Sequence, residues 1–232
     1  MKWSWKLTRI AGIDVYVHAT FFLLLIWLAW SYWLMMGALS AVLSGVGFIL
    51  ALFVCIVLHE LGHALTARRY GIRTRHITLL PIGGVASMER MPSDPRQEIR
   101  VALAGPAVNV AIALALWGWL RASNGWVPPE QLGLAGGPFL QRLMIVNLFV
   151  AGFNLLPAFP MDGGRVLRAA LALRMDYARA TRVAASLGQG LALALGFLGL
   201  FINPFLLFIA LFVWIGAAAE ASATQIKSAL AG

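Results

Sequence analysis

The sequence predicts an all-α polytopic membrane protein, with six transmembrane helices and a small β-sheet at the cytoplasmic side. Hydrophobic residues make up 61% of the 232 residues and charged residues only 12%. In soluble domains, about 45–50% of the residues are apolar and about 25% are charged. A formal charge of +9 could indicate a nucleic-acid partner. The basic residues lie, however, in short segments between long apolar runs, where membrane topology requires them. We therefore expect a lipid bilayer around the chain and no nucleic acid.

Six apolar runs approach or exceed the roughly 20 residues that cross a bilayer as a helix. They cover residues 20–36, 40–67, 99–120, 138–156, 184–202 and 204–219. The segment before the first run is too long and too mixed for the start of a signal peptide, so we expect that run to be an uncleaved anchor. Neither a repeat nor a long linker interrupts the pattern. Residues 1–232 are therefore predicted to form a single six-span domain.

The basic residues also predict the orientation of the chain in the membrane. With a cytoplasmic N-terminus, only Arg121 and Arg142 among the 18 lysines and arginines fall outside. Cytoplasmic segments carry such an excess of positive charge, so both termini are predicted to be cytoplasmic.

Three short segments rich in β-branched residues lie outside the helices, at 12–18, 72–80 and 83–89. Glycine or proline bounds each of them, which is typical of strands. A free edge of this sheet could pair with an extended peptide segment of another protein. A purely structural hairpin that caps the bundle explains the same pattern.

The stretch VLHELGHALTARR, residues 57–69, places His59, Glu60 and His63 inside an apolar run. Ionisable groups in lipid are costly unless they have a partner or a task. On a helix the two histidines are about 6 Å apart along the axis and about 40° apart around it, so both can bind one ion. Glu60 can then act as a general base, as in the H-E-x-x-H pattern of zinc peptidases. Zinc suits two imidazoles and a carboxylate, although the sequence leaves iron or manganese open.

A third ligand is needed, and Asp162 in FNLLPAFPMDGGRVLRA, residues 153–169, is the candidate. Prolines before it and glycines after it indicate a broken helix that could present the carboxylate to a metal. Asp162 could equally be the N-cap of a cytoplasmic helix. The spacing favours neither alternative.

These residues carry a resemblance to a known family. HELGH in the second run, Gly105-Pro106 in the third and Asn154-Leu-Leu-Pro-Ala-Phe-Pro-Met-Asp162-Gly-Gly resemble the site-2 proteases, which are intramembrane zinc metalloproteases. The similarity is greatest to six-span archaeal and bacterial members. The chain shows neither a PDZ nor a CBS module, which fits a compact member or part of a longer protein.

The resemblance implies specific roles for the matching residues. His59, His63 and Asp162 would bind one Zn²⁺ per chain, Glu60 would be the catalytic base, and Asn154 would help to hold the substrate or the developing oxyanion. It also implies cleavage in or near a transmembrane segment of a membrane-protein client, in a prokaryotic cell membrane.

Two other functional classes compete with this hypothesis. A zinc transporter would need further ligands stepped along the membrane normal, and the sequence offers none outside the HELGH and Asp162 set. A catalytically silent, zinc-binding client scaffold would be expected to lack Glu60 or a ligand. Two more polar residues, Asn109 and Asn147, lie within apolar runs, and we interpret them as interhelical hydrogen-bonding groups worth about 0.6 kcal/mol each.

Overall fold

The computed structural model describes residues 3–128 and 137–231. The chain divides into two compact units. The first unit comprises residues 1–91 and 107–151, and the second comprises residues 92–106 and 152–232. The fold of each unit is described separately below.

The first unit contains a four-stranded sheet of β1 (Ser4–Ile10), β2 (Ile13–His18), β3 (Thr74–Leu80) and β4 (Gly83–Met88), in that spatial order. β1 and β2 are antiparallel, β2 and β3 parallel, and β3 and β4 antiparallel. The sheet and its last three strands confirm the sequence prediction. β1 was not predicted, because its side chains are nearly all exposed and mix charged with apolar residues.

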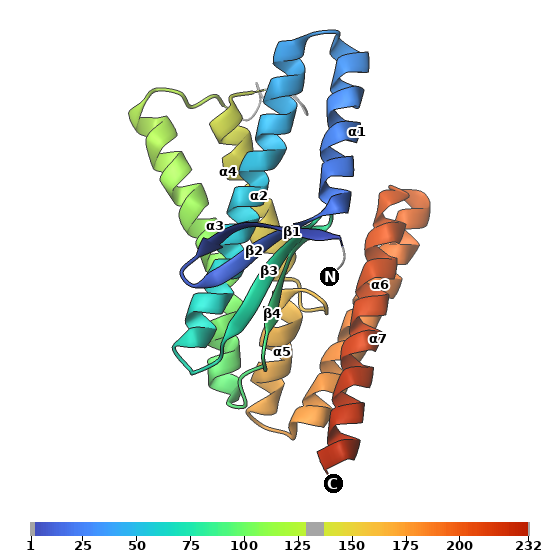
Figure 1. The fold of residues 1–232 in the computed structure, drawn as a ribbon. Helices are drawn as coiled ribbons and strands as arrows, with labels where there is room; N and C mark the ends of the chain where they lie inside the picture. The colour runs from blue at the N-terminus through green and yellow to red at the C-terminus, as the bar shows by residue number, and fades with distance from the viewer. Residues whose placement is uncertain (1–2, 129–136, 232) are drawn as a thin grey trace. The chain divides into compact units, whose positions relative to one another are not determined.

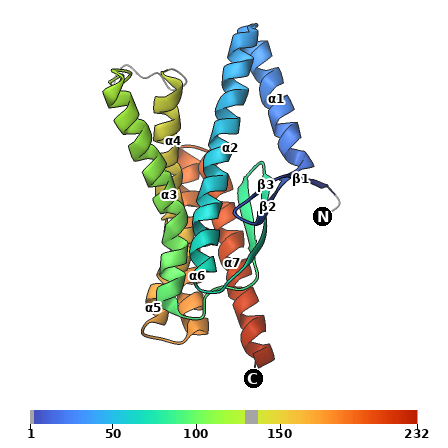
Figure 2. The ribbon, with the colours of Figure 1, turned by 60° about the vertical axis from the view of Figure 1, so that its left-hand side comes forward.

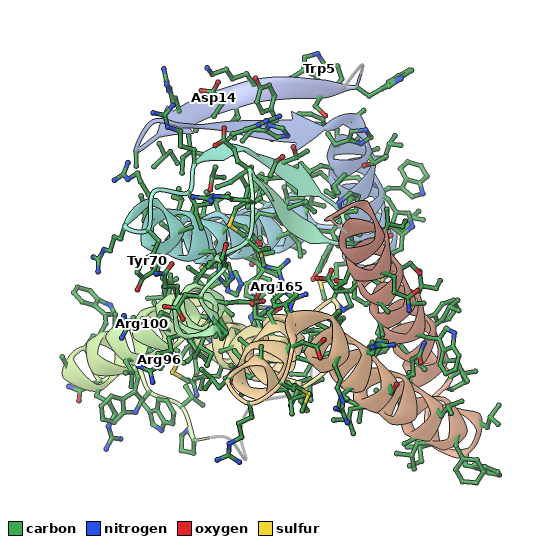
Figure 3. All side chains as sticks on the ribbon, turned by 90° about the horizontal axis from the view of Figure 1, so that it is seen from below. Trp5, Asp14, Tyr70, Arg96, Arg100 and Arg165 are labelled. Atoms are coloured by element: carbon green, nitrogen blue, oxygen red, sulfur yellow. The ribbon has the colours of Figure 1, made fainter. Side chains whose placement is uncertain are left out.

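A tight turn creates the first hairpin. Ala11 and Gly12 join β1 to β2 with φ values of 50° and 86°, the left-handed pair that matches the twist of a two-residue hairpin loop. Figure 3 shows Trp5 and Asp14 on the two strands of this hairpin.

The sheet packs against helix α2 (Leu39–Arg68), which follows α1 (Ala19–Met36) after a short turn at Gly37. Figures 1 and 2 show α1 and α2 as a helical hairpin with the sheet beside its lower end. Every second residue of β2 is buried, as expected for a strand with one face on a core. The shared core of strands and helices consists of Ile13, Val15, Val17, Phe21, Phe53, Val57, Leu61, Ala64, Ile77 and Leu79.

The remaining helices are α3 (Pro95–Ala122), α4 (Phe139–Asn154), α5 (Asp162–Ala172), α6 (Tyr177–Phe201) and α7 (Phe205–Ala231). In the second unit, α6 and α7 form an antiparallel pair (Figure 1). Small residues allow the close approach: a Cβ on Gly199 would lie 3.0 Å from the backbone nitrogen of Leu207.

Five helices in the described part of the chain are long and apolar enough to cross a membrane: α1, α2, α3, α6 and α7. The chain is an integral membrane protein with a small sheet. The fourth predicted run, at residues 138–156, forms α4 with only 16 residues. Such a helix is about 24 Å long, against about 30 Å of hydrocarbon, so the sixth crossing stays a prediction.

Candidate metal centre

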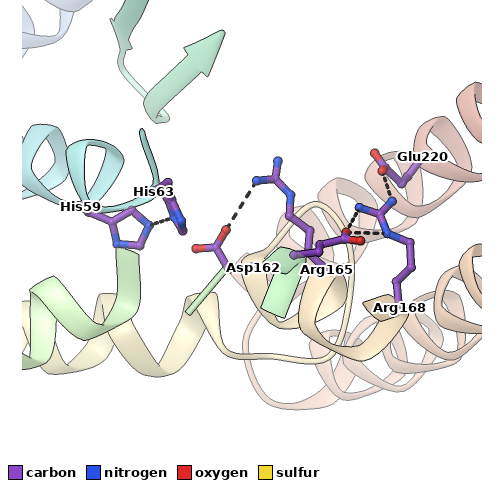
Figure 4. Close-up of polar contacts among 7 residues, drawn as sticks. His59, His63, Asp162, Arg165, Arg168 and Glu220 are labelled. Carbon is purple, nitrogen blue, oxygen red and sulfur yellow. Dashed lines mark hydrogen bonds and ion pairs between the residues drawn. The ribbon is translucent and has the colours of Figure 1, made fainter. Parts of the chain in front are cut away.

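Two buried histidines face one another on α2 in the first unit. Their Nε2 atoms are 3.1 Å apart, and the exposed fractions of His59 and His63 are 5% and 3%. Two imidazole nitrogens bound at about 2.05 Å to one tetrahedral ion are about 3.3 Å apart. The two nitrogens are therefore close enough for one ion to contact both, as the i, i+4 spacing predicts, and their role as ligands stays a prediction. Figure 4 shows the two rings.

The other nitrogen of His59 has a partner that the sequence did not reveal. Nδ1 of His59 contacts Oδ1 of Asn109 on α3, and Nδ2 of Asn109 donates to Oδ1 of Asn147 on α4 at 2.8 Å. Nδ2 of Asn147 in turn donates to the carbonyl of Leu143 at 2.8 Å. The exposed fraction of both asparagines is 0%. They are interhelical groups, as expected, but Asn109 also contacts a candidate metal ligand, and Asn147 holds Asn109. Their position inside apolar runs was the available signal.

Glu60 is half-buried on α2 and lies next to strand β4. A Cβ on Gly84 would be only 2.8 Å from Cγ of Glu60 and 3.0 Å from Cγ2 of Ile56. Only glycine therefore lets β4 pass this close to the glutamate. Since β4 is the last strand in the sheet order, the candidate base lies beside an edge strand.

Asp162 is the first residue of α5 in the second unit, and its exposed fraction is 6%. The N-cap position belongs to Met161, which makes no side-chain capping bond. Asp162 therefore stands at the start of a helix, as the alternative expected, although the N-cap position is one residue earlier. Its carboxylate is stabilised by the helix dipole and lies 3.8 Å from Nη1 of Arg165 (Figure 4).

Gly163 and Gly164 follow the break in the helix that the sequence predicted. Both lie in α5 against the preceding loop. A Cβ on Gly163 would lie 2.3 Å from the carbonyl oxygens of Leu155 and Leu156, and one on Gly164 would lie 2.6 Å from the backbone of Ala158. The glycines therefore allow the close packing of α5 that places Asp162.

A buried arginine anchors the same helix. Nε of Arg168 donates to Oε1 of Glu98 at 2.9 Å, and the guanidinium also pairs with Glu220 of α7. The exposed fraction of Arg168 and of Glu98 is 1%. The guanidinium lies over the rings of Phe159 and Tyr177, 5.1 Å and 5.0 Å from their centroids.

Burial alone would lower the pKa of the Arg168 guanidinium. The acidic groups around it, Glu98 first, outweigh burial and raise this pKa above its ordinary value. Arg168 is thus a permanent charge that ties α5 to the start of α3 and to α7.

The predicted site residues are thus distributed over both units. His59, Glu60 and His63 lie in the first unit, and Asp162 and Asn154 lie in the second, where Asn154 is the half-buried last residue of α4. His59, His63 and Asp162 are all buried and together offer two imidazoles and a carboxylate, a donor set that zinc accepts. Among residues 3–128 and 137–231, no second set of three such donors could hold a metal.

Comparisons with known proteins give matches to zinc metalloproteases. The sequence profile of peptidase family M50 matches residues 47–135 and 130–195. A zinc metalloprotease of Methanocaldococcus jannaschii is 40% identical over 98% of this chain and 63% of its own length. Stage IV sporulation protein FB of Bacillus subtilis is 29% identical over 67% of this chain and 51% of its own length.

A solved structure agrees with these sequence matches. The site-2 protease from Methanocaldococcus jannaschii superposes with a TM-score of 0.66 at 39% identity, over 94% of this chain and 95% of that one. The chain spans between half and two thirds of the length of the curated relatives it matches.

Proposed function

Since this chain belongs to peptidase family M50, we propose that it is an intramembrane zinc metalloprotease. Its substrate would be a membrane protein, cleaved at a peptide bond in or near a transmembrane segment. One observation carries the proposal: two buried histidines on an apolar helix have Nε2 atoms 3.1 Å apart, with a glutamate next to one of them.

His59, His63 and Asp162 would bind one zinc ion per chain. The donor set suits this metal, and the spacing of the imidazole nitrogens supports it. When bound, zinc supplies a Lewis acid that polarises the scissile carbonyl and lowers the pKa of water.

Glu60 would be the general base. A carboxylate between two ligand histidines can take a proton from the attacking water and later give it to the leaving amine. Asn154, at the end of α4, would donate its amide hydrogens to the substrate backbone or to the developing oxyanion.

Strand β4 would hold the substrate. It is an edge strand, and Gly84 brings its backbone against Glu60. A client segment that pairs with β4 would have its carbonyls extended beside the base. The alternative is a hairpin with a purely structural role. A proline scan along residues 83–89 separates the two: lost cleavage with retained zinc supports pairing, and unchanged turnover removes it.

The topology belongs to the same proposal. α4 would form the sixth crossing, with the irregular residues after Asn154 completing the passage where they line a cavity. Both termini and the sheet would then be cytoplasmic, in a prokaryotic cell membrane. Residues 1–232 would form one protease domain, which is supported by a structural match covering 94% of the chain.

The decisive experiment compares the wild type with Glu60→Gln in detergent on a panel of fluorogenic single-span peptides, with zinc measured in both. We expect cleavage by the wild type alone and about one zinc in each protein, because Gln keeps the shape of Glu60 but cannot accept a proton. Asp94→Asn, which removes an exposed carboxylate outside the site, serves as the control and should cleave normally.

The remaining outcomes favour other functions. Equal cleavage by both proteins would contradict the role of Glu60. Zinc without cleavage in either protein would favour the client scaffold. The transporter has less support, since the described residues contain no second metal-ligand group.

A further inference from the structure

The hydrogen bonds from His59 to Leu143 run through three helices of the first unit. They link α2, α3 and α4 through His59, Asn109 and Asn147. All three side chains are buried, and both asparagines are fully buried. We refer to Asn109 and Asn147 as the amide relay.

The relay can have only one direction. A backbone carbonyl only accepts, so the group of Asn147 that faces Leu143 must be its NH₂. Oδ1 of Asn147 is then left to accept from Nδ2 of Asn109, which leaves Oδ1 of Asn109 facing His59. Flipping either amide would oppose two buried acceptors, which is unfavourable without water.

An imidazole nitrogen that faces an acceptor must carry the proton. The direction of the relay therefore assigns the proton of neutral His59 to Nδ1 and leaves the lone pair on Nε2. Nε2 is also the atom that faces His63 at 3.1 Å. The carbonyl of Leu143 thus determines, through two amides, which nitrogen of His59 can bind a metal.

We propose that Asn109 and Asn147 are positioning residues that hold His59 in its Nδ1–H tautomer and so present Nε2 to the metal. This inference rests on the proposed function, because it assumes that His59 binds the proposed zinc ion. Partners of this kind orient ligand rings, and their loss typically weakens metal affinity by about 10–100-fold.

A merely structural role makes a different prediction. If the asparagines only joined helices, any buried amide of the same unit would be equivalent to them. Gln141 provides the matched control: it is fully buried on α4, and its side chain bonds the backbone of Val127 at 3.1 Å and 2.6 Å. Both of these hydrogen bonds go to Val127 and neither goes to a histidine.

The first test measures zinc affinity by chelator competition in Glu60→Gln protein, where cleavage plays no part. We expect about 10–100-fold weaker binding for Asn109→Leu, a smaller loss for Asn147→Leu and no change for Gln141→Leu. Equal losses for the Asn109 and Gln141 variants, or unchanged affinity of a folded Asn109→Leu protein, would overturn the proposal.

The second test reads the tautomer directly in metal-free protein labelled with ¹⁵N-histidine. In the wild type we expect Nδ1 of His59 to be protonated and Nε2 to be unprotonated. In Asn147→Leu we expect the tautomer with the proton on Nε2 to appear as well. Asn147→Asp should keep the wild-type signal, because a protonated carboxyl group can donate to the carbonyl of Leu143 and accept from Asn109, as the amide does.

The proposed role of the amide relay would be contradicted by an unprotonated Nδ1 on His59 in the wild type. It would also be contradicted if the Asn147→Leu and Asn147→Asp variants gave the same spectrum. This spectrum needs neither zinc nor a substrate. Failure of the relay is therefore distinguishable from failure of the protease assignment, which the cleavage panel tests separately. If Asn109→Leu does not fold, the two Asn147 variants carry the test alone.

Discussion

The first unit holds His59 with neutral amides, whereas the second unit holds α5 with charges. In the first unit, Asn109 and Asn147 link the imidazole to a backbone carbonyl. In the second unit, Arg168 is buried between two acids and two aromatic rings. The two asparagines, Arg168 and Glu98 are almost completely buried, whereas the side chain of Glu220 is 37% exposed.

The difference follows from what each ligand needs. A histidine has two distinct nitrogens, so its partner must specify the site of the proton, and amides do this because each has one donor end and one acceptor end. A carboxylate needs only the correct position, and an anchored helix supplies it. Neutral amides also avoid the desolvation of charge that the Arg168 cluster must offset.

The largest expected effect is on the charged cluster. Arg168→Met would leave Glu98 buried without its cation, and we expect the free energy of unfolding to fall by about 3–5 kcal/mol. Unfolding in mixed detergent micelles measures it. The double variant Arg168→Met with Glu98→Met should recover more than half of the loss, and a double variant no more stable than the single one would contradict the account.

The next effect concerns the packing of α5. Gly163→Ala would place a Cβ 2.3 Å from two backbone carbonyls, and we expect about 1–3 kcal/mol of destabilisation together with loss of zinc. Gly152→Ala is the matched control in the same unit, because its Cβ would meet nothing within 4 Å. Equal stability of the two variants would mean that the close contact at Gly163 is unimportant.

A third prediction separates geometry from stability in the first unit. Gly84→Ala would push a methyl group to 2.8 Å from Cγ of Glu60. We expect turnover to fall about tenfold, since small misplacements of a catalytic group are costly, while zinc content stays unchanged. Gly47→Ala on α2, which has open space around it, should cleave normally. A loss of zinc would show instead that the methyl group disturbs the histidine pair.

The smallest expected effect is on the exposed ion pair of Lys6 and Asp14, which can be compared with the two buried clusters. Lys6 lies 2.7 Å from Asp14, and its hydrogen bond holds the pKa of that carboxyl below 3.8. The stabilisation is therefore present above pH 3.8 and is lost as pH falls through the lower, folded-state value. The unfolding midpoint of Lys6→Met should differ slightly from wild type at pH 7 and converge with it in acid. A difference that grows in acid would contradict this sign.

Short sequence patterns predicted those features of the fold and the site that depend on residues close together in the chain. The i, i+4 spacing of His59 and His63 places both on one face of any helix, and alternation or β-branching identified three strands. The sequence did not predict β1, because its exposed side chains show no alternation between buried and exposed positions. The sequence offered a helix start at Asp162 as one alternative, but it did not predict the close contacts of Gly163, because these depend on where the loop before α5 packs.

Composition and short-range spacing were enough to predict the membrane class, the histidine pair with its glutamate and three strands of the sheet. Packing brings Asn109 and Asn147 to His59, β4 beside Glu60 at Gly84, and Arg168 between Glu98 and Glu220. Such partners are up to 70 residues apart. A pattern in the chain shows that a buried polar group needs a partner, but only packing brings that partner into contact.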